Sequence, residues 1–477
     1  MKQKFNKFSR VLSALLLCAG LVAVGCTEGP LGDDQNTEQG APELEGPVTI
    51  TLEKITCDSV TFNGHLNVSA SDLPFSKVSI YYSDTESFDI NTAQVVSTTS
   101  FDKDQNFSIT LTRLKGGTKY NYCMVAEIKS EKVYGDVVSL TIPFSPSNCH
   151  IVSEVGFYIF KAVKGNSSES VGNVASASVL WESFGTDIAP NVGDLLKEVS
   201  YKDGYIEFKT ADTFKEGNAV IAAMDAEGTI LWSWHIWFTD QPWGQEYFNN
   251  AGTIMDRNLG ATSATPGDVG ALGLLYQWGR KDPFLGSSSI STSIGAASTI
   301  AWPSAVSSDS SNGTIEYATA NPTTFITCNS SNSDWYYTGS SSTDNTRWTT
   351  LETSKSIYDP CPSGWRVPDG GGNGVWSKAL GSSLYFTQSS LYESANKGMN
   401  FSGKFGSAST IWYPVSGSRD YNDGSLLNVG RYGYYWSASP NDYDVCYLRF
   451  TYGGYVYPSG SSLRANGLSV RCLQESK

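Results

Sequence analysis

The sequence predicts a multidomain, mainly β protein. A chain of 477 residues is too long to fold around one ordinary hydrophobic core, so we expect about three folded units. Charged residues make up only 17% of the chain and aromatic residues 13%, a composition typical of β-rich, loop-rich extracellular proteins. Short runs of alternating apolar and polar residues recur from residue 47 onward, and this alternation indicates strands. The formal net charge of −14 argues against nucleic acid and anionic lipid surfaces as partners.

Residues 1–25 have the pattern of a secretory signal peptide. A basic start, MKQKFNKFSR, precedes the apolar run VLSALLLCAGLVAVG, which is short for a bilayer span. The run ends at Gly25-Cys26, which resembles a bacterial lipobox with Ala23 where leucine is more usual. The resemblance implies a lipid anchor on Cys26 and an outer-membrane lipoprotein. The alternative is an ordinary signal peptide followed by a chance cysteine.

Residues 26–46 are acidic and lack aromatic side chains, so they cannot bury a core and are expected to form a disordered tether. An acidic stretch soon after the lipidated cysteine resembles the surface-export signal of Bacteroidetes lipoproteins, which implies exposure at the cell surface. A plain solvated spacer is the alternative.

Residues 47–143 predict a β-sandwich, because six short alternating strands are separated by turn residues. The segment LKGGTKYNYCMVAEI resembles the fibronectin type III strand that opens with a tyrosine corner, and Tyr120 would be that tyrosine. Cys57 and Cys123 are the candidates for a disulfide between two strands of this sandwich. Domains of this type usually serve as spacers.

Residues 144–242 predict a second β-rich domain, which begins at the turn-forming stretch PFSPSN. In its last strand, period-two alternation places four large apolar side chains on one face: Trp232, Trp234, Ile236 and Phe238. We interpret this stripe as core rather than as a sugar platform. His235 is interpreted as a hydrogen-bonded structural histidine rather than a ligand or base.

The motifs of several enzyme classes are missing. There is no H-E-x-x-H, C-x-x-C or G-x-S-x-G pattern, and only three histidines are present. We therefore expect no catalytic residue, no metal site and no cofactor. Paired glycosidase carboxylates carry no local signature, so that possibility stays open. Cys361, between prolines in DPCPSGW and far from any histidine in sequence, is interpreted as a disulfide cysteine rather than a nucleophile.

Six motifs occur in order between residues 243 and 477. They are MDRNLGAT from Met255, LLYQWGR from Leu274, DPCPSGWRVP from Asp359, WYPVSGSRD from Trp412, GYYWSAS from Gly433 and GLSVRC from Gly467. Together they resemble the Fibrobacter-type major paralogous domain, which occurs in surface lipoproteins and fimbria-associated proteins of Bacteroidetes and their relatives. That family is similar to the C-type-lectin-like fold, so the resemblance implies an α+β domain here.

The resemblance also implies a disulfide between Cys361 and Cys472, and a short helix that directs Trp376 and Leu380 toward the core. Seven cysteines follow Cys26, an odd number, so at least one is unpaired or bonds to another chain. The pairing of Cys149, Cys328 and Cys446 stays open.

Ligand-binding candidates lie in two acidic loops and one aromatic segment. The tripeptides that calcium-dependent lectins use are missing, so calcium is an open alternative rather than an expectation. The candidates are Arg419, Asp420, Asn422, Asp423, Asn441, Asp442, Tyr455 and Tyr457. Solvated turns are the alternative for the acidic loops, and a buried structural role is the alternative for Arg419.

These observations favour a lipid-anchored surface protein that acts as an adhesion module and recognises an extracellular glycan or host protein. Association with fimbriae is one form that this role could take. The first alternative is a non-catalytic structural subunit of a surface or pilus assembly, docked through a β-edge. The second is a glycan-active or oxidase-like enzyme, because the C-type-lectin-like fold also includes formylglycine-generating oxidases. The adhesion hypothesis rests on fold analogy, which does not by itself define an activity.

Overall fold

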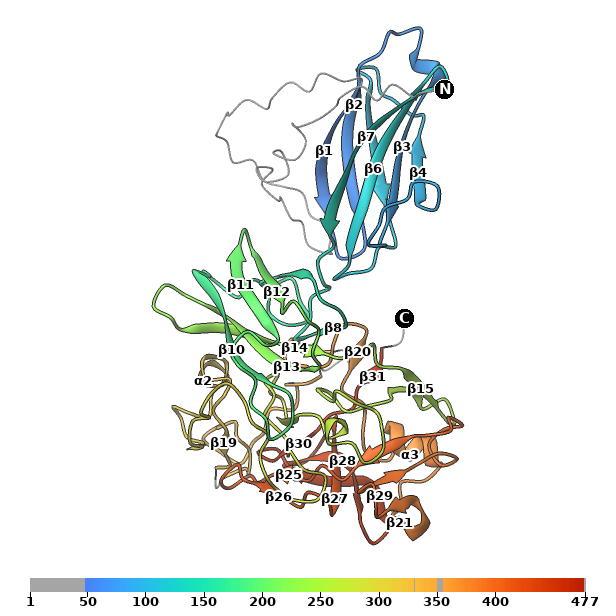
Figure 1. The fold of residues 1–477 in the computed structure, drawn as a ribbon. Coiled ribbons are helices and arrows are strands. Elements are labelled where there is room, and N and C mark those ends of the chain that lie inside the picture. The colour runs from blue at the N-terminus through green and yellow to red at the C-terminus, as the bar shows by residue number, and fades with distance from the viewer. Residues whose placement is uncertain (1–47, 330, 350–354, 476–477) are drawn as a thin grey trace. The chain divides into compact units, whose positions relative to one another are not determined.

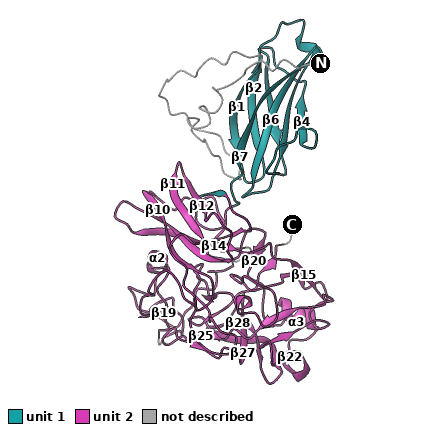
Figure 2. Ribbon diagram, viewed as in Figure 1, with its two compact units in different colours: residues 1–145, 157–161 teal, residues 146–156, 162–477 magenta. Residues whose placement is uncertain are grey.

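The computed structural model describes residues 48–329, 331–349 and 355–475 and shows a multidomain, mainly β protein. The described chain forms two compact units (Figure 2). The smaller unit comprises the residues up to 145 together with 157–161, and the larger comprises 146–156 and 162–477. The expected signal peptide 1–25, Cys26 and the tether 26–46 lie outside the described residues.

The smaller unit is a β-sandwich, as the alternating strands predict (Figure 1). One sheet has the strand order β1-β2-β5 and the other β4-β3-β6-β7. Apolar side chains that alternate along these strands meet between the sheets in one core, which includes Phe62, Ile80 and Ile109. The elements are β1 (Val48–Ile55), β2 (Val60–Leu66), η1 (Leu73–Phe75), β3 (Ser76–Ser83), β4 (Gln94–Thr98), β5 (Asn106–Leu111), β6 (Lys119–Ile128), β7 (Glu131–Thr141) and β9 (Phe157–Lys161).

Two predictions about this sandwich have different outcomes. The backbone N–H of Lys115 donates to the hydroxyl of Tyr120 at 3.1 Å, five residues along the chain, which is the contact expected of a tyrosine corner. The candidate disulfide between Cys57 and Cys123 is wrong, because Cys123 carries a free thiol. Cys57 lies in the turn between β1 and β2, whereas Cys123 lies in β6, within the other sheet.

The first part of the larger unit contains a sheet with the order β10-β13-β14-β8. Strands β13 and β14 are antiparallel and β8 is parallel to β14, so β14 is an interior strand. Strands β11 and β12 are antiparallel neighbours in a different, three-stranded sheet. The elements are β8 (Cys149–Val152), β10 (Ser176–Ser183), β11 (Leu196–Lys202), β12 (Tyr205–Thr210), β13 (Gly217–Met224) and β14 (Ile230–Phe238).

Short strands and two short α-helices make up the rest of the larger unit. Its longest sheet has the path β21-β29-β28-β27-β30-β25-β26, and β17 pairs with β30. The elements are β15 (Gly244–Tyr247), β16 (Gly252–Met255), η2 (Val269–Ala271), β17 (Leu275–Gln277), β18 (Val306–Ser307), α2 (Ile315–Ala320), β19 (Ile326–Thr327), β20 (Trp365–Arg366), α3 (Val375–Leu380), β21 (Phe386–Thr387), η3 (Ser389–Leu391), β22 (Tyr392–Glu393), β23 (Gly398–Asn400), β24 (Trp412–Pro414), β25 (Ser418–Arg419), β26 (Leu426–Leu427), β27 (Tyr432–Asn441), β28 (Asp444–Thr451), β29 (Tyr455–Leu463), β30 (Gly467–Ser469) and β31 (Leu473–Gln474).

The expected boundary at residues 242 and 243 does not separate two compact units. Trp181 and Trp237, from the region expected to be a separate domain, belong to the same hydrophobic core as Trp278 and Trp436. The indole N–H of Trp237 donates to the backbone oxygen of Ala261 at 3.0 Å. The two regions therefore fold around one core.

Strand β14 explains why these regions share a core. The stripe that includes Trp232 and Trp234 is buried, as predicted, but the opposite face is buried as well. On that opposite face, the Nε2 atom of His235 lies 2.8 Å from the Oδ1 atom of Asn218, whose amide donates to the oxygen of Gly260. His235 is thus a buried, hydrogen-bonded side chain, in agreement with its predicted structural role.

The disulfide between Cys361 and Cys472 is confirmed, and both residues are fully buried in the shared core. It secures the end of the described chain beside β31, which pairs with both β16 and β20. Helix α3 comes after Cys361 in the chain. Its Trp376 side chain is completely buried, as expected. Cys149, Cys328 and Cys446 carry free thiols. Among the described residues, no helix has the length and apolar composition needed to cross a membrane.

Candidate ligand-binding surface

The sequence-derived candidates fall into three places. Arg419 ends β25, and Asp420, Asn422 and Asp423 lie in the loop that leads to β26. Asn441 ends β27, and Asp442 lies in the turn that leads to β28. Tyr455 and Tyr457 lie in β29. Each place has its own chemistry.

Arg419 holds its own loop rather than facing a ligand. Its Nε and Nη2 atoms donate to the backbone oxygen of Leu285, at 3.1 and 2.9 Å. Its Nη1 atom donates to the oxygen of Gly424 at 2.6 Å. Burial lowers the pKa of Arg419 to about 10, so the side chain still carries its charge at neutral pH. With its donors occupied by carbonyl groups, Arg419 takes the structural alternative that the sequence left open.

The acidic side chains after Arg419 bind their own loop. One carboxylate oxygen of Asp420 accepts from the backbone N–H of Asn422, and one of Asp423 accepts from that of Ser425, both at 2.8 Å. The hydrogen bond from Ser425 lowers the pKa of Asp423. These are the contacts of solvated turns. Within the described ranges, no three His, Cys, Asp or Glu side chains gather closely enough to hold a metal ion.

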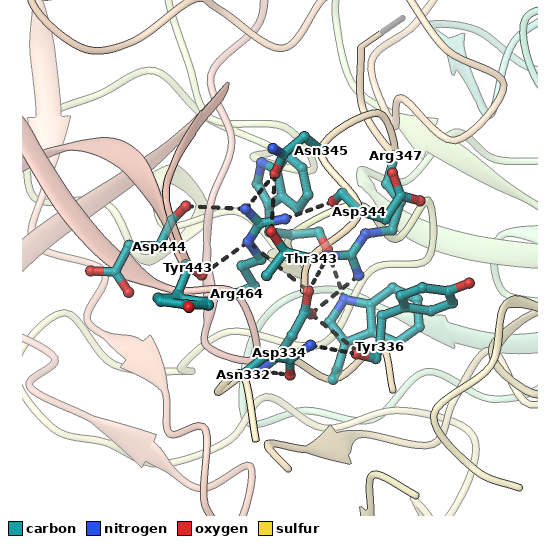
Figure 3. A network of polar contacts seen from close by, with 12 residues as sticks. Asn332, Asp334, Tyr336, Thr343, Asp344, Asn345, Arg347, Tyr443, Asp444 and Arg464 are labelled. Carbon is teal, nitrogen blue, oxygen red and sulfur yellow. Dashed lines mark hydrogen bonds and ion pairs between the residues drawn. The ribbon is translucent and has the colours of Figure 1, made fainter. Parts of the chain in front are cut away.

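The exposed turn at Asn441 and Asp442 is secured from inside by Arg464. The fully buried guanidinium donates to the backbone oxygens of Asp442 and Tyr443 at 2.9 and 3.0 Å. It also donates to the backbone oxygen of Asp344 at 2.6 Å, so it joins this turn to a second loop (Figure 3). This turn is therefore anchored from within the fold.

A second buried arginine shares a carboxylate with Arg464. Asp334, which is not exposed at all, accepts two hydrogen bonds from Arg347 and lies 4.0 Å from the Nε atom of Arg464 (Figure 3). Both guanidinium groups lie over the ring of Trp278, at 4.9 and 4.7 Å. One carboxylate and several carbonyl dipoles thus compensate two buried charges. We interpret this cluster as a structural clamp, because it is enclosed by protein.

The exposed chemistry lies instead on β27, β28 and β29, which run side by side (Figure 1). Strand register places Tyr434 opposite Arg449, and Arg449 opposite Tyr457. Because directly opposed residues point to the same face of a sheet, these side chains form a line across three strands. Tyr385, which precedes the edge strand β21, extends this line and is 65% exposed.

We name this line the tyrosine–arginine row; its members are Tyr385, Tyr457, Arg449, Tyr432, Tyr434 and Tyr447. The rings of Tyr385 and Tyr457 stack with centroids 5.5 Å apart. The guanidinium of Arg449 lies 5.3 Å from the ring of Tyr457 and 5.2 Å from that of Tyr432. The Tyr432 ring stacks on Tyr434 at 5.7 Å and an interplanar angle of 4°. An arginine thus lies within an aromatic series.

The row passes from the surface into the core. Tyr447 is 6% exposed and belongs to the shared core, whereas Tyr432, Arg449 and Tyr457 are half-buried. Burial raises the pKa of Tyr434 to about 12, so this phenol is protonated at neutral pH. The buried end of the row fixes the positions of its side chains, and the exposed end near Tyr385 is accessible to a ligand.

Arg449 differs from Arg419, Arg464 and Arg471 in its partners. Within the described ranges no carboxylate forms an ion pair with it, and its Nε atom is buried without a hydrogen-bond partner. Its hydrogen-bond contact is with Tyr447, a neutral phenol. Arg471, by contrast, donates to the backbone oxygen of Trp412 and to the side chain of Asn258. Arg449 therefore lacks a carboxylate partner for its charge within the described ranges, although its Nε atom is closed to solvent.

Sequence reasoning found one strand of this surface and missed the others. It selected Tyr455, which is 47% exposed, and Tyr457, which belongs to the row, but it did not select Arg449, Tyr432 or Tyr385. A usable signal was present in β28, where Tyr447 and Arg449 alternate with Leu448 and Phe450.

Comparisons with known proteins add little. No family model matches the chain, and no curated protein matches it. A solved structure of the sensor domain of the anti-sigma factor RsgI4 from Pseudobacteroides cellulosolvens is 17% identical, with a TM-score of 0.16. That match covers 21% of this chain and 97% of the sensor domain. A TM-score of this size supports no conclusion about fold or function.

Proposed function

We propose that the chain is a lipid-anchored surface protein whose larger unit recognises an extracellular ligand, without catalysis. The observation that carries the proposal is the tyrosine–arginine row, in which a cation without a carboxylate partner lies between aromatic rings at an accessible sheet face. Aromatic and arginine side chains in such sites supply contact area and directed hydrogen bonds. The signal-peptide pattern ending at Cys26 and the six ordered motifs support the surface location and the C-type-lectin-like assignment.

The absence of catalysis is part of the proposal and has its own support. An oxidase of the formylglycine-generating type needs a reactive cysteine pair. Here Cys361 and Cys472 are bonded to each other and neither is exposed. We therefore assign this pair a structural role.

Binding of the full chain, purified in detergent, to arrays of glycans and host proteins tests the proposal, with and without calcium. Tyr457→Ala should abolish the binding by breaking the row between Tyr385 and Arg449. Tyr443→Ala is the matched control, because Tyr443 is 52% exposed on the same hairpin but outside the row. Equal loss in both variants, or no binding under any condition, contradicts the proposal.

A structural subunit remains the second proposal, and one feature of the smaller unit favours it. Strand β7 is an edge of its sheet and exposes Val133, Tyr134 and Val137. Edge strands with exposed apolar side chains can pair with a strand of another protein. Co-purification of the full chain with pilin-like proteins, lost on Val137→Pro, together with no glycan binding, would favour this role over recognition.

A further inference from the structure

We infer that the ligand of the tyrosine–arginine row is an acidic glycan, one whose carboxylate or sulfate groups bind Arg449. This inference rests on the proposed recognition function and specifies the class of ligand. It joins two observations, the missing ion-pair partner of Arg449 within the described ranges and the shape of the surface that surrounds it.

The first observation concerns charge. A guanidinium presents five N–H donors in a plane, and a carboxylate or sulfate matches this pattern better than a neutral hydroxyl. Arg419, Arg464 and Arg471 use their donors on protein oxygens. Arg449 has a neutral phenol as its hydrogen-bond contact, and within the described ranges it forms no ion pair. An anionic group is the partner that this site lacks.

The tyrosine rings on both sides of the Arg449 guanidinium increase its preference for an anionic ligand. The rings of Tyr432 and Tyr457 flank the guanidinium and exclude water from its faces. A charge-assisted hydrogen bond is stronger in such partly dry surroundings than at an open surface. The net charge of −14 repels polyanions over the surface as a whole, so attraction at this point has a local cause.

The second observation concerns shape, and it favours a glycan over a peptide. The row crosses β21, β29, β28 and β27, three strand spacings or about 14 Å, which is the length of a short oligosaccharide. It lies on a sheet face, where the backbone groups of interior strands already bond to their neighbours, so a peptide cannot add as a strand there. Phenol hydroxyls, an open ring at Tyr385 and a guanidinium suit a chain of hydroxyl groups with anionic substituents.

The test compares charged and neutral forms of one polymer. The full chain, purified in detergent, is titrated with polygalacturonate and with the same polymer after methyl esterification, and separately with chondroitin sulfate and its desulfated form. We expect the charged member of at least one pair to bind about tenfold more tightly or better, because a hydrogen bond to a charged group contributes that much. This preference should weaken as sodium chloride is raised.

Arg449→Gln should remove the preference, and Arg449→Lys should restore part of it because the charge returns without the planar donors. Arg431→Gln is the matched control: it makes the same change in net charge at an exposed arginine next to Tyr432 and should leave affinity unchanged. Unchanged melting temperatures would show that each variant folds.

Three results would overturn the inference, and they separate it from the proposed function. Equal affinity for charged and neutral polymers, lost on Tyr457→Ala, would refute the acidic ligand and leave recognition by the row intact. Equal binding of poly-L-glutamate would refute the assignment to a glycan. Absence of binding to every probe, glycan or protein, would refute both proposals.

Discussion

Replacing Trp237 with alanine tests whether residues 146–477 form one cooperative unit. The indole is not exposed at all, and it packs in the core that also contains Trp278 and Trp436. Truncating a buried tryptophan costs about 3–5 kcal/mol, and the backbone oxygen of Ala261 loses a hydrogen bond worth about 1 kcal/mol. We therefore expect a total loss of about 4–6 kcal/mol, which is comparable to the whole stability of many domains.

Urea titration followed by hydrogen exchange and mass spectrometry is the assay. Peptides from β14 and peptides from β27–β30 should lose protection together, since one core joins them. Val137→Ala is the control, because Val137 is 53% exposed in the smaller unit and its removal should change the unfolding free energy by less than about 0.5 kcal/mol. Loss of protection restricted to residues 146–242 would refute a shared core.

Three further predictions concern buried groups. Replacing both Cys361 and Cys472 with alanine opens a loop with a sequence separation of 111. The double variant should lose about 5 kcal/mol of unfolding free energy. A loss below about 1 kcal/mol in urea titration would contradict this chain-entropy account. Asp334→Asn leaves two buried guanidinium groups without their carboxylate and should cost about 3–5 kcal/mol; an unchanged urea midpoint would show that carbonyl groups alone suffice. Burial lowers the pKa of His235 to about 3, below the ordinary 6.5, so the stability that this residue contributes is complete above pH 6.5 and is lost as the pH falls toward 3. His235→Gln should therefore make urea midpoints fall less steeply between pH 7 and 4, and parallel curves for the two proteins would reject this assignment.

The sequence by itself determined the position of many strands and of the disulfide. Strands β1 and β6 lie within residues 47–143, where the sequence predicts a β-sandwich. They were predictable because side chains of a sandwich strand alternate between core and solvent with a period of two residues. Tyr120 was identified from the resemblance to the fibronectin type III tyrosine corner, whose contact with Lys115 spans only five residues. The bridge between Cys361 and Cys472 followed from the six motifs and their order.

Only the tertiary structure decided which regions share a core and which side chains form the candidate site. Period-two alternation assigned one buried face to β14, but pairing with β13 and β8 and packing against residues beyond 243 bury the other face too. Arg419 finds its acceptor at Leu285, 134 residues away, and no local pattern encodes that contact. The tyrosine–arginine row depends on the register of three strands, and each of the two pairings between them contains a register shift. Register is fixed by long-range packing rather than by the residues of any one strand.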